Sequence, residues 1–350
     1  MDRGTEGRAG AGSCGTAAEA GFDGAVSQAG LDEIAQILRQ ITGRIAVLVH
    51  NSTDGDTYGS GFALCCALQT LGKDVALVHE EPIPQYLASV LPERDFYLCL
   101  PDEAAMEGLF WDAVVVFDTA DPKLLGKRVR LLGRTDCVIN VDHHLTNQGF
   151  GHYNHVDVKA AATAELARLL IAALGLPLDR DTAIAIYMGI CTDTGGFSYS
   201  NTTCRTHEIA AETLRFGLDV AHLRYRFFDA VTPEKLRCHG FVANAMRFYG
   251  GGKVAVAIVP GAALAAMGAT EADCEGLVNL GRNVIGVEVS VLAREVRPGE
   301  FRVNLRGRGG ADVAEIAKRF DGGGHRAAAG CTVKAAPDQI EGLLLAAIRG

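Results

Sequence analysis

The chain has 350 residues, 48% of them hydrophobic, and this length and composition fit two globular domains that each bury a core. Its formal net charge of -9 disfavours long nucleic acid as a partner, because such binding depends on a cationic surface. No apolar run approaches the roughly 20 residues of a membrane span, so no membrane partner is expected. The ten cysteines include no C-x-x-C pair, which argues against a zinc finger or a secreted disulfide framework. This use of cysteine favours a cytoplasmic protein.

The first part of the chain predicts a tail, a helix and a strand. Residues 1–28 are rich in Gly and Ala with scattered charges, a composition typical of a disordered tail. Apolar residues recur at helical spacing from Leu31 to about Thr42, which predicts an amphipathic helix. The apolar run 44–49 then predicts a buried strand that ends at His50, followed by a polar loop to Asp56 and a helix of small residues.

The pattern continues with more short apolar runs separated by helical segments. Four further buried strands are predicted, at residues 74–78, 96–100, 112–117 and 137–141. Strands that are continuous apolar runs and alternate with helices predict an α/β fold with a parallel sheet covered on both faces. Ligands of such sheets bind beyond the carboxyl ends of the strands. His50, Asp118 and Asp142 all follow or end predicted strands, so we expect them to meet at that edge.

The second half of the chain predicts helices and then a second, smaller unit. Residues 160–248 have helical periodicity, with Asp193 expected just beyond one helix end. A last helix is expected from Pro233 to the glycines at 250–252, and two alternating runs after it predict antiparallel strands joined around Pro298-Gly299. The expected organisation is a tail (1–28), a parallel-sheet domain (29–232), a helical linker (233–252) and a smaller α/β domain (253–350).

Acidic and imidazole side chains recur at the ends of several predicted elements. They are Asp54, Asp56, Asp118, Asp193, His50, His143 and His144. Oxygen and imidazole ligands without thiolate suit Mn²⁺, with Mg²⁺ or Co²⁺ as substitutes, better than structural zinc. Two divalent ions would balance four aspartates, and a shared carboxylate can hold two metals about 3.5–4 Å apart to activate water against a phosphoryl group.

A structural interpretation of the same residues is the alternative. A lone aspartate after a strand is usually a helix N-cap or a turn residue, as Asp142 would be if it stood alone. A lone His50 would more often be a hydrogen-bonded core residue. Recurrence at several strand ends favours the metal centre.

A glycine-rich run in the second domain admits two interpretations: Gly322, Gly323, Gly324 and His325. Glycines allow backbone amides to approach a phosphate closely, whereas the alternative is a plain turn. Nine Lys/Arg against six Asp/Glu lie between Arg282 and Arg326, including Arg306, although the whole chain is acidic. This local cationic surface fits an anionic substrate, because guanidinium groups suit phosphate geometry; the alternative is an ordinary solvated face.

Together these motifs resemble the DHH phosphoesterases over nearly the whole chain after about residue 30. The matching motifs are His50-x-x-x-Asp54-Gly55-Asp56, Asp118, Asp142-His143-His144 and Gly189 to Phe197 around Asp193, with the Gly322 to Gly330 segment similar to the DHH-associated domain. The resemblance implies a centre of two manganese ions. One ion would be held by His50, Asp54 and Asp118, and the other by Asp56, Asp118, His143 and Asp193, with Asp118 bridging.

The resemblance also implies roles for the remaining motif residues. Asp142 would orient its neighbours and His144 would touch the scissile phosphate, while Arg306 and the run from Gly322 to His325 would bind the rest of the nucleotide. The family usually has proline at the position of Thr53, which puts the rigidity of that loop in doubt and leaves the metal ligands unchanged.

The chain is most similar to the stand-alone members of the family that degrade very short RNA, the nano-RNases. We therefore expect an Mn²⁺-dependent phosphodiesterase that releases mononucleotides from oligoribonucleotides of a few residues, including linear dinucleotides, through a hydroxide activated by two metals. The alternatives are an enzyme for 3′-phosphoadenosine 5′-phosphate or cyclic di-AMP, and a non-catalytic nucleotide-binding regulator. The expected partner is short RNA or a small nucleotide, and a homodimer is compatible with these expectations.

Overall fold

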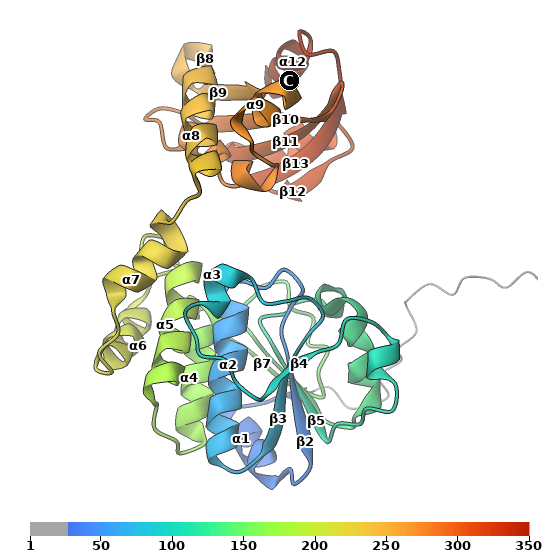
Figure 1. Ribbon diagram of the computed structural model, residues 1–350, viewed down its shortest axis with the longest axis vertical. Helices are drawn as coiled ribbons and strands as arrows, with labels where there is room; N and C mark the ends of the chain where they lie inside the picture. The colour runs from blue at the N-terminus through green and yellow to red at the C-terminus, as the bar shows by residue number, and fades with distance from the viewer. Residues whose placement is uncertain (1–26, 350) are drawn as a thin grey trace, which may run out of the picture. The chain divides into compact units, whose positions relative to one another are not determined.

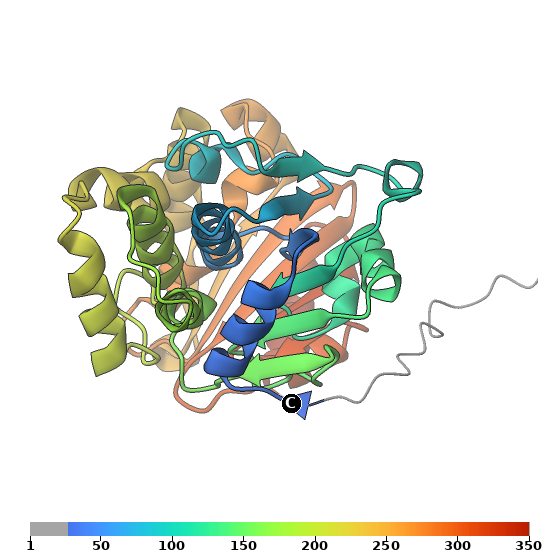
Figure 2. The same ribbon diagram turned by 90° about the horizontal axis from the view of Figure 1, so that it is seen from below.

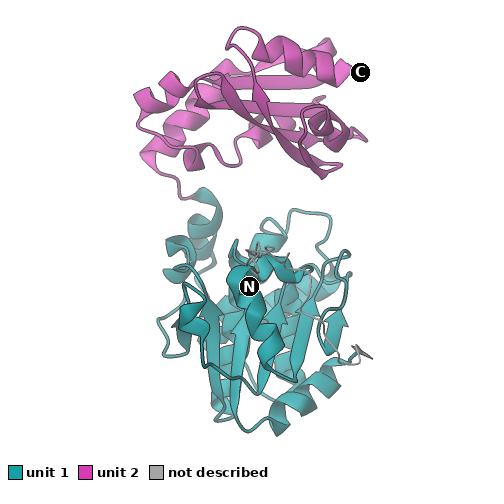
Figure 3. Ribbon diagram, turned by 90° about the vertical axis from the view of Figure 1, so that its right-hand side faces the viewer, with its two compact units in different colours: residues 1–229 teal, residues 230–350 magenta. Residues whose placement is uncertain are grey.

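The structure, a computed structural model, describes residues 27–349. These residues form two compact units that divide between Asp229 and Ala230 (Figure 3). The predicted tail lies outside the described residues except for Ser27 and Gln28, which form a strand instead. No helix within residues 27–349 is long and apolar enough to cross a membrane.

The first unit is built on a seven-stranded sheet in which every neighbouring pair of strands is parallel. Its strands are β1 (Ser27–Gln28), β2 (Arg44–Leu48), β3 (Asp74–His79), β4 (Tyr97–Cys99), β5 (Ala113–Phe117), β6 (Val138–Asp142) and β7 (Tyr153–Val156). Their order is β1-β7-β6-β5-β2-β3-β4, so β2 to β4 extend the sheet in one direction and β5 to β7 in the other, with β1 at the edge beside β7. The predicted parallel sheet is confirmed, and β1 and β7 are additions.

Helical segments cover both faces of this sheet, as the continuous apolar strands require (Figure 1, and turned in Figure 2). They are α1 (Leu31–Gln40), α2 (Gly55–Thr70), α3 (Gln85–Ala88), η1 (Ala104–Met106), η2 (Pro122–Arg134), α4 (Thr163–Ala173), α5 (Arg180–Asp193), α6 (Cys204–Leu214), α7 (Val220–Arg224) and η3 (Tyr225–Asp229). Helices α1, α2, α4 and α5 share one core with the sheet, and η1 and η2 pack on the opposite face.

Small residues bring α2, α4 and α5 unusually close together. A Cβ added at Gly59 of α2 would lie 2.3 Å from the carbonyl oxygen of Ala185 in α5. A Cβ at Gly189 of α5 would lie 2.5 Å from the Cβ of Ala164 in α4 and 2.8 Å from Oδ1 of Asp56. These glycines therefore let three helices converge beside the start of α2, where Asp56 is buried.

The second unit contains a six-stranded sheet of order β12-β13-β11-β10-β9-β8, in which only β9 and β10 are parallel. Its strands are β8 (Arg247–Tyr249), β9 (Val254–Val259), β10 (Val289–Arg297), β11 (Glu300–Gly307), β12 (Gly323–His325) and β13 (Ala328–Lys334). Its helices are α8 (Pro233–Ala245), η4 (Gly250–Gly252), α9 (Gly261–Met267), η5 (Ala272–Cys274), α10 (Val278–Arg282), α11 (Val313–Lys318) and α12 (Ile340–Arg349). The predicted hairpin around Pro298-Gly299 is confirmed as β10 and β11.

The segment expected as a linker contributes to the core of the second unit. Helix α8 ends at Ala245, and the chain continues as β8 rather than as helix to the glycines. Cys238 and Val242 of α8 are fully buried against Ala257 and Val259 of β9. A three-residue strand with no apolar run carries too little signal to be predicted from periodicity.

Candidate metal centre

The side chains of the predicted site follow strands at one edge of the first unit's sheet. His50 lies two residues after β2, Asp118 directly follows β5, and Asp142 is the last residue of β6. Strands β2 and β5 are neighbours, and the chain leaves them in opposite directions. Such a point of reversal opens a crevice beyond the carboxyl ends of the strands, where ligands bind.

Asp118 lies between two histidines at this edge. Its Oδ2 is 3.5 Å from Nε2 of His50, and its Oδ1 is 3.5 Å from Nε2 of His143. The residue is 3% exposed and has φ of 55°, a left-handed conformation that aspartate tolerates better than most residues. The hydroxyl of Thr163 donates a 3.0 Å hydrogen bond to Oδ1, which fixes the carboxylate.

Asp54 is both a helix cap and a member of the cluster. Its Oδ1 accepts hydrogen bonds from the backbone N–H groups of Asp56 and Thr57, at 3.1 and 3.0 Å, and so caps α2. Its Oδ2 lies 3.7 Å from Nε2 of His50. Asp54 therefore caps a helix with one oxygen and faces His50 with the other.

Asp56 is held by the N-terminus of α4. Its Oδ2 and Oδ1 accept hydrogen bonds from the backbone N–H groups of Thr163 and Ala164, at 2.7 and 2.8 Å. The N-cap of α4 is Ala162, which has no side chain that could accept from the first amides of the helix. The unpaired N–H groups of Thr163 and Ala164 therefore donate to the buried carboxylate instead. Thr163 was not predicted, and a helix start without a capping side chain is the sequence signal that could have revealed it.

His143 and Asp193 complete the cluster from β6 and α5. Nε2 of His143 is 3.4 Å from Oδ2 of Asp193 and 4.0 Å from Oδ2 of Asp56. Nδ1 of His143 donates to the carbonyl oxygen of Ala160 at 3.1 Å, which leaves Nε2 free to act as a ligand. Asp193 is the last residue of α5, not a residue beyond it as expected.

These residues form three overlapping groups whose ligand atoms lie within 4.8 Å of one another. The groups are His50, Asp54 and Asp118; Asp56, His143 and Asp193; and Asp118, His143 and His144. The structure thus brings all six predicted ligand residues together with His144. Asp118 and His143 each belong to two groups, but only Asp118, whose two oxygens face different histidines, offers a separate ligand atom to each of two ions.

Burial and mutual repulsion raise the pKa values of most carboxyls in the cluster. Burial, reinforced by the charge of Asp118, raises the pKa of Asp56 and Asp54 and raises that of Asp193 to about 6. Burial alone would raise the pKa of Asp118 too, but its hydrogen bond with His50 and the nearby imidazoles outweigh this and lower it. A buried site where carboxylates repel one another fits divalent cations, which supply the missing positive charge.

Asp142 organises the residues around it from a fully buried position. Its Oδ1 accepts hydrogen bonds from the backbone N–H of His143 at 2.8 Å and from Nδ1 of His144 at 2.7 Å. Its Oδ2 accepts a 2.6 Å hydrogen bond from the amide of Asn147, a residue the sequence did not reveal. The bond to Asp142 raises the pKa of His144 to about 9, and that half-exposed imidazole lies beside Asp118 and His143 at the edge of the cluster.

We expect Asp142→Asn to lower turnover by roughly 10- to 100-fold, the usual cost of disturbing the supports of a metal site. An amide there cannot accept from the backbone N–H of His143, Nδ1 of His144 and the amide of Asn147 at once, so the imidazole of His144 and the backbone at His143 lose their fixed orientation. Steady-state rates with saturating metal would measure this. Asp136→Asn, at the exposed turn before β6, is the matched control and should stay near the unmodified rate; equal rates for both variants would contradict the role of Asp142.

The predicted glycine loop of the second unit is a strand. Gly323, Gly324 and His325 form β12, which pairs antiparallel with β13. A Cβ at Gly324, whose φ is 141°, would lie 2.5 Å from the carbonyl oxygen of Ala328, and one at Gly322 would lie 2.4 Å from that of Gly330. At least two of the glycines are therefore required for close strand contact, and the loop expectation is corrected.

Arg306 and His325 nevertheless share one face of this sheet. Both pair in register with Ala328, Arg306 from β11 and His325 from β12, and paired residues point to the same side. Two strand spacings separate them by about 10 Å. Arg306 is half-buried, and burial followed by the nearby charge of Arg282 lowers its pKa. Within residues 27–349 neither arginine forms an ion pair with a carboxylate, so this face can accept an anion.

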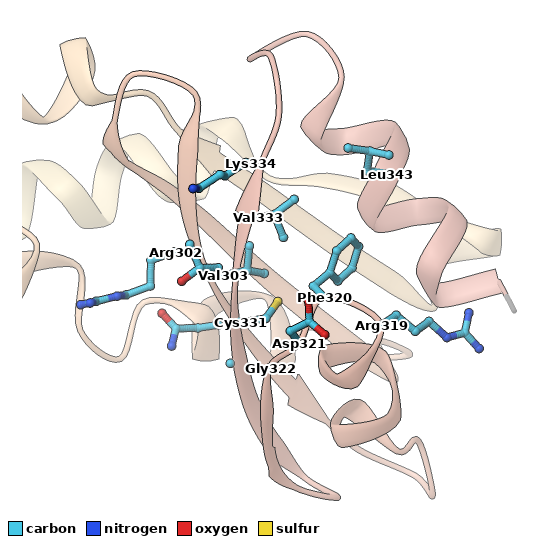
Figure 4. Close-up of a pocket in the computed structure, with 13 residues that line it drawn as sticks. Arg302, Val303, Arg319, Phe320, Asp321, Gly322, Cys331, Val333, Lys334 and Leu343 are labelled. Atoms are coloured by element: carbon cyan, nitrogen blue, oxygen red, sulfur yellow. The ribbon is translucent and has the colours of Figure 1, made fainter. Parts of the chain in front are cut away.

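A separate cavity of about 870 Å³ lies beside β13 in the second unit. Of the residues predicted to bind substrate, only Gly322 lines this cavity. Figure 4 shows the guanidinium groups of Arg302 and Arg319 pointing away from each other, with Cys331 between them. These two arginines therefore do not form a pair that converges on one phosphate. Arg306 instead lines another cavity of about 450 Å³ with Arg294 and Asn304.

Comparisons with known proteins match both units. The model of the DHH family, N-terminal domain, matches residues 44–190, and that of the DHHA1 domain matches residues 251–349. The chain is 36% identical, over 90% of its length and 92% of the relative, to the Thermus thermophilus protein named bifunctional oligoribonuclease and PAP phosphatase NrnA. It is 25% identical to the cyclic-di-AMP phosphodiesterase GdpP of Geobacillus thermodenitrificans, over 83% of this chain and 45% of that one.

A solved structure shares the fold. An exopolyphosphatase-related protein from Bacteroides fragilis is similar with a TM-score of 0.81 and 23% identity, over 91% of this chain and 95% of that one. At this level of identity the similarity concerns the fold alone. The two units therefore have a known structural precedent.

Proposed function

The chain belongs to the DHH family, and from this membership we propose that it is a divalent-metal-dependent phosphodiesterase that hydrolyses very short oligoribonucleotides to mononucleotides. The observation that carries the proposal is the buried cluster of carboxylates and imidazoles at the carboxyl edge of the first sheet. The NrnA relative, matched over nearly its whole length, supports short RNA as the substrate.

The proposed ligands divide into two sets that share Asp118. His50 and Asp54 would hold one ion with it, and Asp56, His143 and Asp193 would hold the other. We propose Mn²⁺, with Mg²⁺ or Co²⁺ as substitutes, because these ions accept oxygen and imidazole ligands without thiolate. When bound, the two ions supply an activated water and neutralise charge on the phosphoryl group.

The chain's own residues orient and support this chemistry. Amides of α4 hold the buried carboxyl of Asp56 in place and favour its charged form, and Thr163 fixes the shared Asp118. Nδ1 of His144 donates to Asp142, so Nε2 of His144 has no part in that bond and can contact a phosphate oxygen. Asp142 and His144 are thus proposed to position the scissile phosphate.

In the second unit we propose that Arg306 and His325 bind the part of the nucleotide away from the bond that breaks. They lie on one sheet face with the small side chain of Ala328 between them, which leaves room for a ligand. The nearby Arg282, which repels Arg306, adds a second cation without a carboxylate partner among residues 27–349. An anion relieves that repulsion.

We expect Arg306→Met to raise the KM for a dinucleotide by roughly 10- to 100-fold, the worth of about 1.5–3 kcal/mol for a charged hydrogen bond. Turnover at saturation should change much less, because the metal ligands are untouched. Steady-state kinetics separate the two parameters. Arg297→Met, at the exposed hairpin end of the same sheet, is the matched control, and an unchanged KM in the Arg306 variant would contradict substrate binding by this face.

Product analysis on purified protein with Mn²⁺ tests the proposal. The substrates are a 5′-labelled RNA dinucleotide, a 24-mer RNA, 3′-phosphoadenosine 5′-phosphate and cyclic di-AMP, offered side by side. We expect the dinucleotide to be hydrolysed fastest and the 24-mer to be a poor substrate. Absence of turnover with metal bound would favour a nucleotide-binding regulator and overturn the proposal.

A second candidate function follows from the relatives. The NrnA relative is also named a PAP phosphatase, and GdpP is named a cyclic-di-AMP phosphodiesterase. A preference for 3′-phosphoadenosine 5′-phosphate or cyclic di-AMP in the same panel would make a signalling nucleotide the main substrate. The chain covers under half of GdpP, so the cyclic dinucleotide has the weaker support of the two.

A further inference from the structure

We propose that Arg128 is a positioning residue for the metal centre, holding the loop that carries His50 and Asp54 through the side chain of Asn51. The inference rests on the proposed function, because it concerns the affinity of the His50, Asp54 and Asp118 group for a divalent cation. Arg128 belongs to η2, which follows β5 and Asp118 in the chain and packs beside the end of β2.

The guanidinium group of Arg128 is buried, and both of its terminal nitrogens donate hydrogen bonds. The residue is 1% exposed, and its burial lowers the pKa to about 10, which leaves it charged at neutral pH. Nη1 donates to the carbonyl oxygen of Val78 at 2.6 Å, Nη2 donates to Oδ1 of Asn51 at 2.5 Å, and Nε lies 3.8 Å from Oε1 of Glu80. A buried charge must keep such partners, so Arg128 ties Asn51 to the end of β3.

The segment η2 also forms a hydrogen bond with the backbone of Asn51. The backbone N–H of Asn51 donates to the carbonyl oxygen of Leu124 at 2.9 Å. Gly126, with φ of 59°, makes the approach possible, because a Cβ there would lie 2.0 Å from Nδ2 of Asn51 and 2.6 Å from Oε1 of Glu80. Two independent hydrogen bonds and a required glycine thus fix this one residue.

Fixing Asn51 restrains the two proposed ligands of this loop, His50 directly before it and Asp54 three residues after it. Asn51 directly follows His50, and the hydroxyl of Thr53 closes the loop by donating to the carbonyl oxygen of His50 at 3.1 Å. Asn51 and Ser52 are otherwise exposed, so without these contacts the loop would have to be ordered when an ion binds. Supports of this kind are worth about 10–100-fold in metal affinity.

The second ligand group provides an internal comparison. Asp56 is held by the amides of α4, and His143 by Ala160 and Asp142. These supports come from elements other than η2. Loss of the Arg128 contact should therefore lower the affinity of the first ligand group for its ion and leave the affinity of the second group unchanged. General destabilisation of the fold would not give this result.

The experiment is a calorimetric titration of Mn²⁺ into the metal-free full chain and its variants. Asn51→Leu removes the acceptor at similar size, Arg128→Met removes the donor, and His50→Ala identifies which binding event belongs to the first group. We expect each of the first two variants to weaken that event by about 10–100-fold and to change the other by less than about threefold. The double variant should bind Mn²⁺ with the same affinity as the weaker-binding single variant, because both substitutions break the same contact between Arg128 and Asn51.

The control is Arg168→Met, which removes a comparable ion pair between α4 and α6, where Arg168 bonds Glu212 at 2.8 and 2.6 Å. Both binding events should survive in it. Unchanged affinity in Asn51→Leu, or equal weakening of both events, would overturn the proposal, and Asn51→Leu alone decides if Arg128→Met fails to fold. An unmodified chain that binds no Mn²⁺ would instead refute the proposed function itself.

Discussion

Replacing Asp118 by asparagine is expected to lower kcat by at least about a thousand-fold, because one substitution disturbs both proposed ion sites. Asp118 faces His50 with one oxygen and His143 with the other, both at 3.5 Å. Metal ions supply several kcal/mol of transition-state stabilisation, and each 1.36 kcal/mol corresponds to a factor of ten. Asparagine keeps the size of the side chain and tolerates the φ of 55°, so the loss would reflect the missing charge.

A matched control lies at the other end of the same strand. Asp112 precedes β5 and accepts a 2.8 Å hydrogen bond from the backbone N–H of Arg44, far from the carboxyl edge. Asp112→Asn should therefore stay within about threefold of the unmodified rate. Dinucleotide hydrolysis under saturating Mn²⁺ measures both variants. Turnover by Asp118→Asn within tenfold of the unmodified protein would show that Asp118 does not bridge two ions.

The sequence predicted the first sheet well because its strands are buried on both faces. Continuous apolar runs such as 113–117 leave few alternatives, and a polar residue directly after such a run must lie at the strand end. That reasoning placed His50, Asp118 and Asp142 at one edge, where the structure has them. The short strands β1 and β7, at one side of the sheet, have neither length nor apolar character, and pairing with their neighbours decides their conformation.

The supports of the site were beyond prediction because they depend on tertiary contacts. The backbone N–H groups of Thr163 and Ala164 reach Asp56 across 107 and 108 residues of chain. Arg128 reaches Asn51 across 77 residues. Neither contact follows from periodicity or motif spacing, although an uncapped helix start and a glycine amid a helical segment were visible signals.

The glycine-rich run shows a different limit. Sequence reasoning left open whether residues 322–325 approach a phosphate or form a turn. The structure gives β12, and Gly322 and Gly324 are needed for the close approach to β13. The composition was compatible with a loop, a turn or a strand, since glycine permits all of them, and only the pairing with Ala328 and Gly330 selects one.

Metal binding is expected to raise the unfolding temperature of the first unit by about 10–20 °C at pH 8. An ion present at a hundred times its Kd contributes about 2.7 kcal/mol, so two ions contribute about 5 kcal/mol. For a unit of this size each kcal/mol shifts the transition by about 2–4 °C. The second unit contains none of the proposed ligands, so its transition should stay where it is.

The increase should be smaller at pH 5, and the signs of the pKa shifts give the reason. The pKa of Asp193 is raised to about 6, so the metal-free protein loses stability as the pH rises from about 4 through 6. The pKa of His144 is raised to about 9, so its contribution is complete below about 6.5 and is lost as the pH rises through 9. The metal-free cluster is thus least stable at alkaline pH, where deprotonated ligands also bind cations best.

Calorimetric scans of metal-free and Mn²⁺-loaded protein at pH 5 and pH 8 measure this dependence. Asp118→Asn should lose most of the increase at pH 8, whereas Asp112→Asn should keep it, because only Asp118 lies within the ligand groups. An increase of equal size at both pH values would mean that cations stabilise the fold away from these carboxylates. If instead the increase follows deprotonation of the cluster, the same buried negative charge that destabilises the metal-free chain is what gives the ions their affinity.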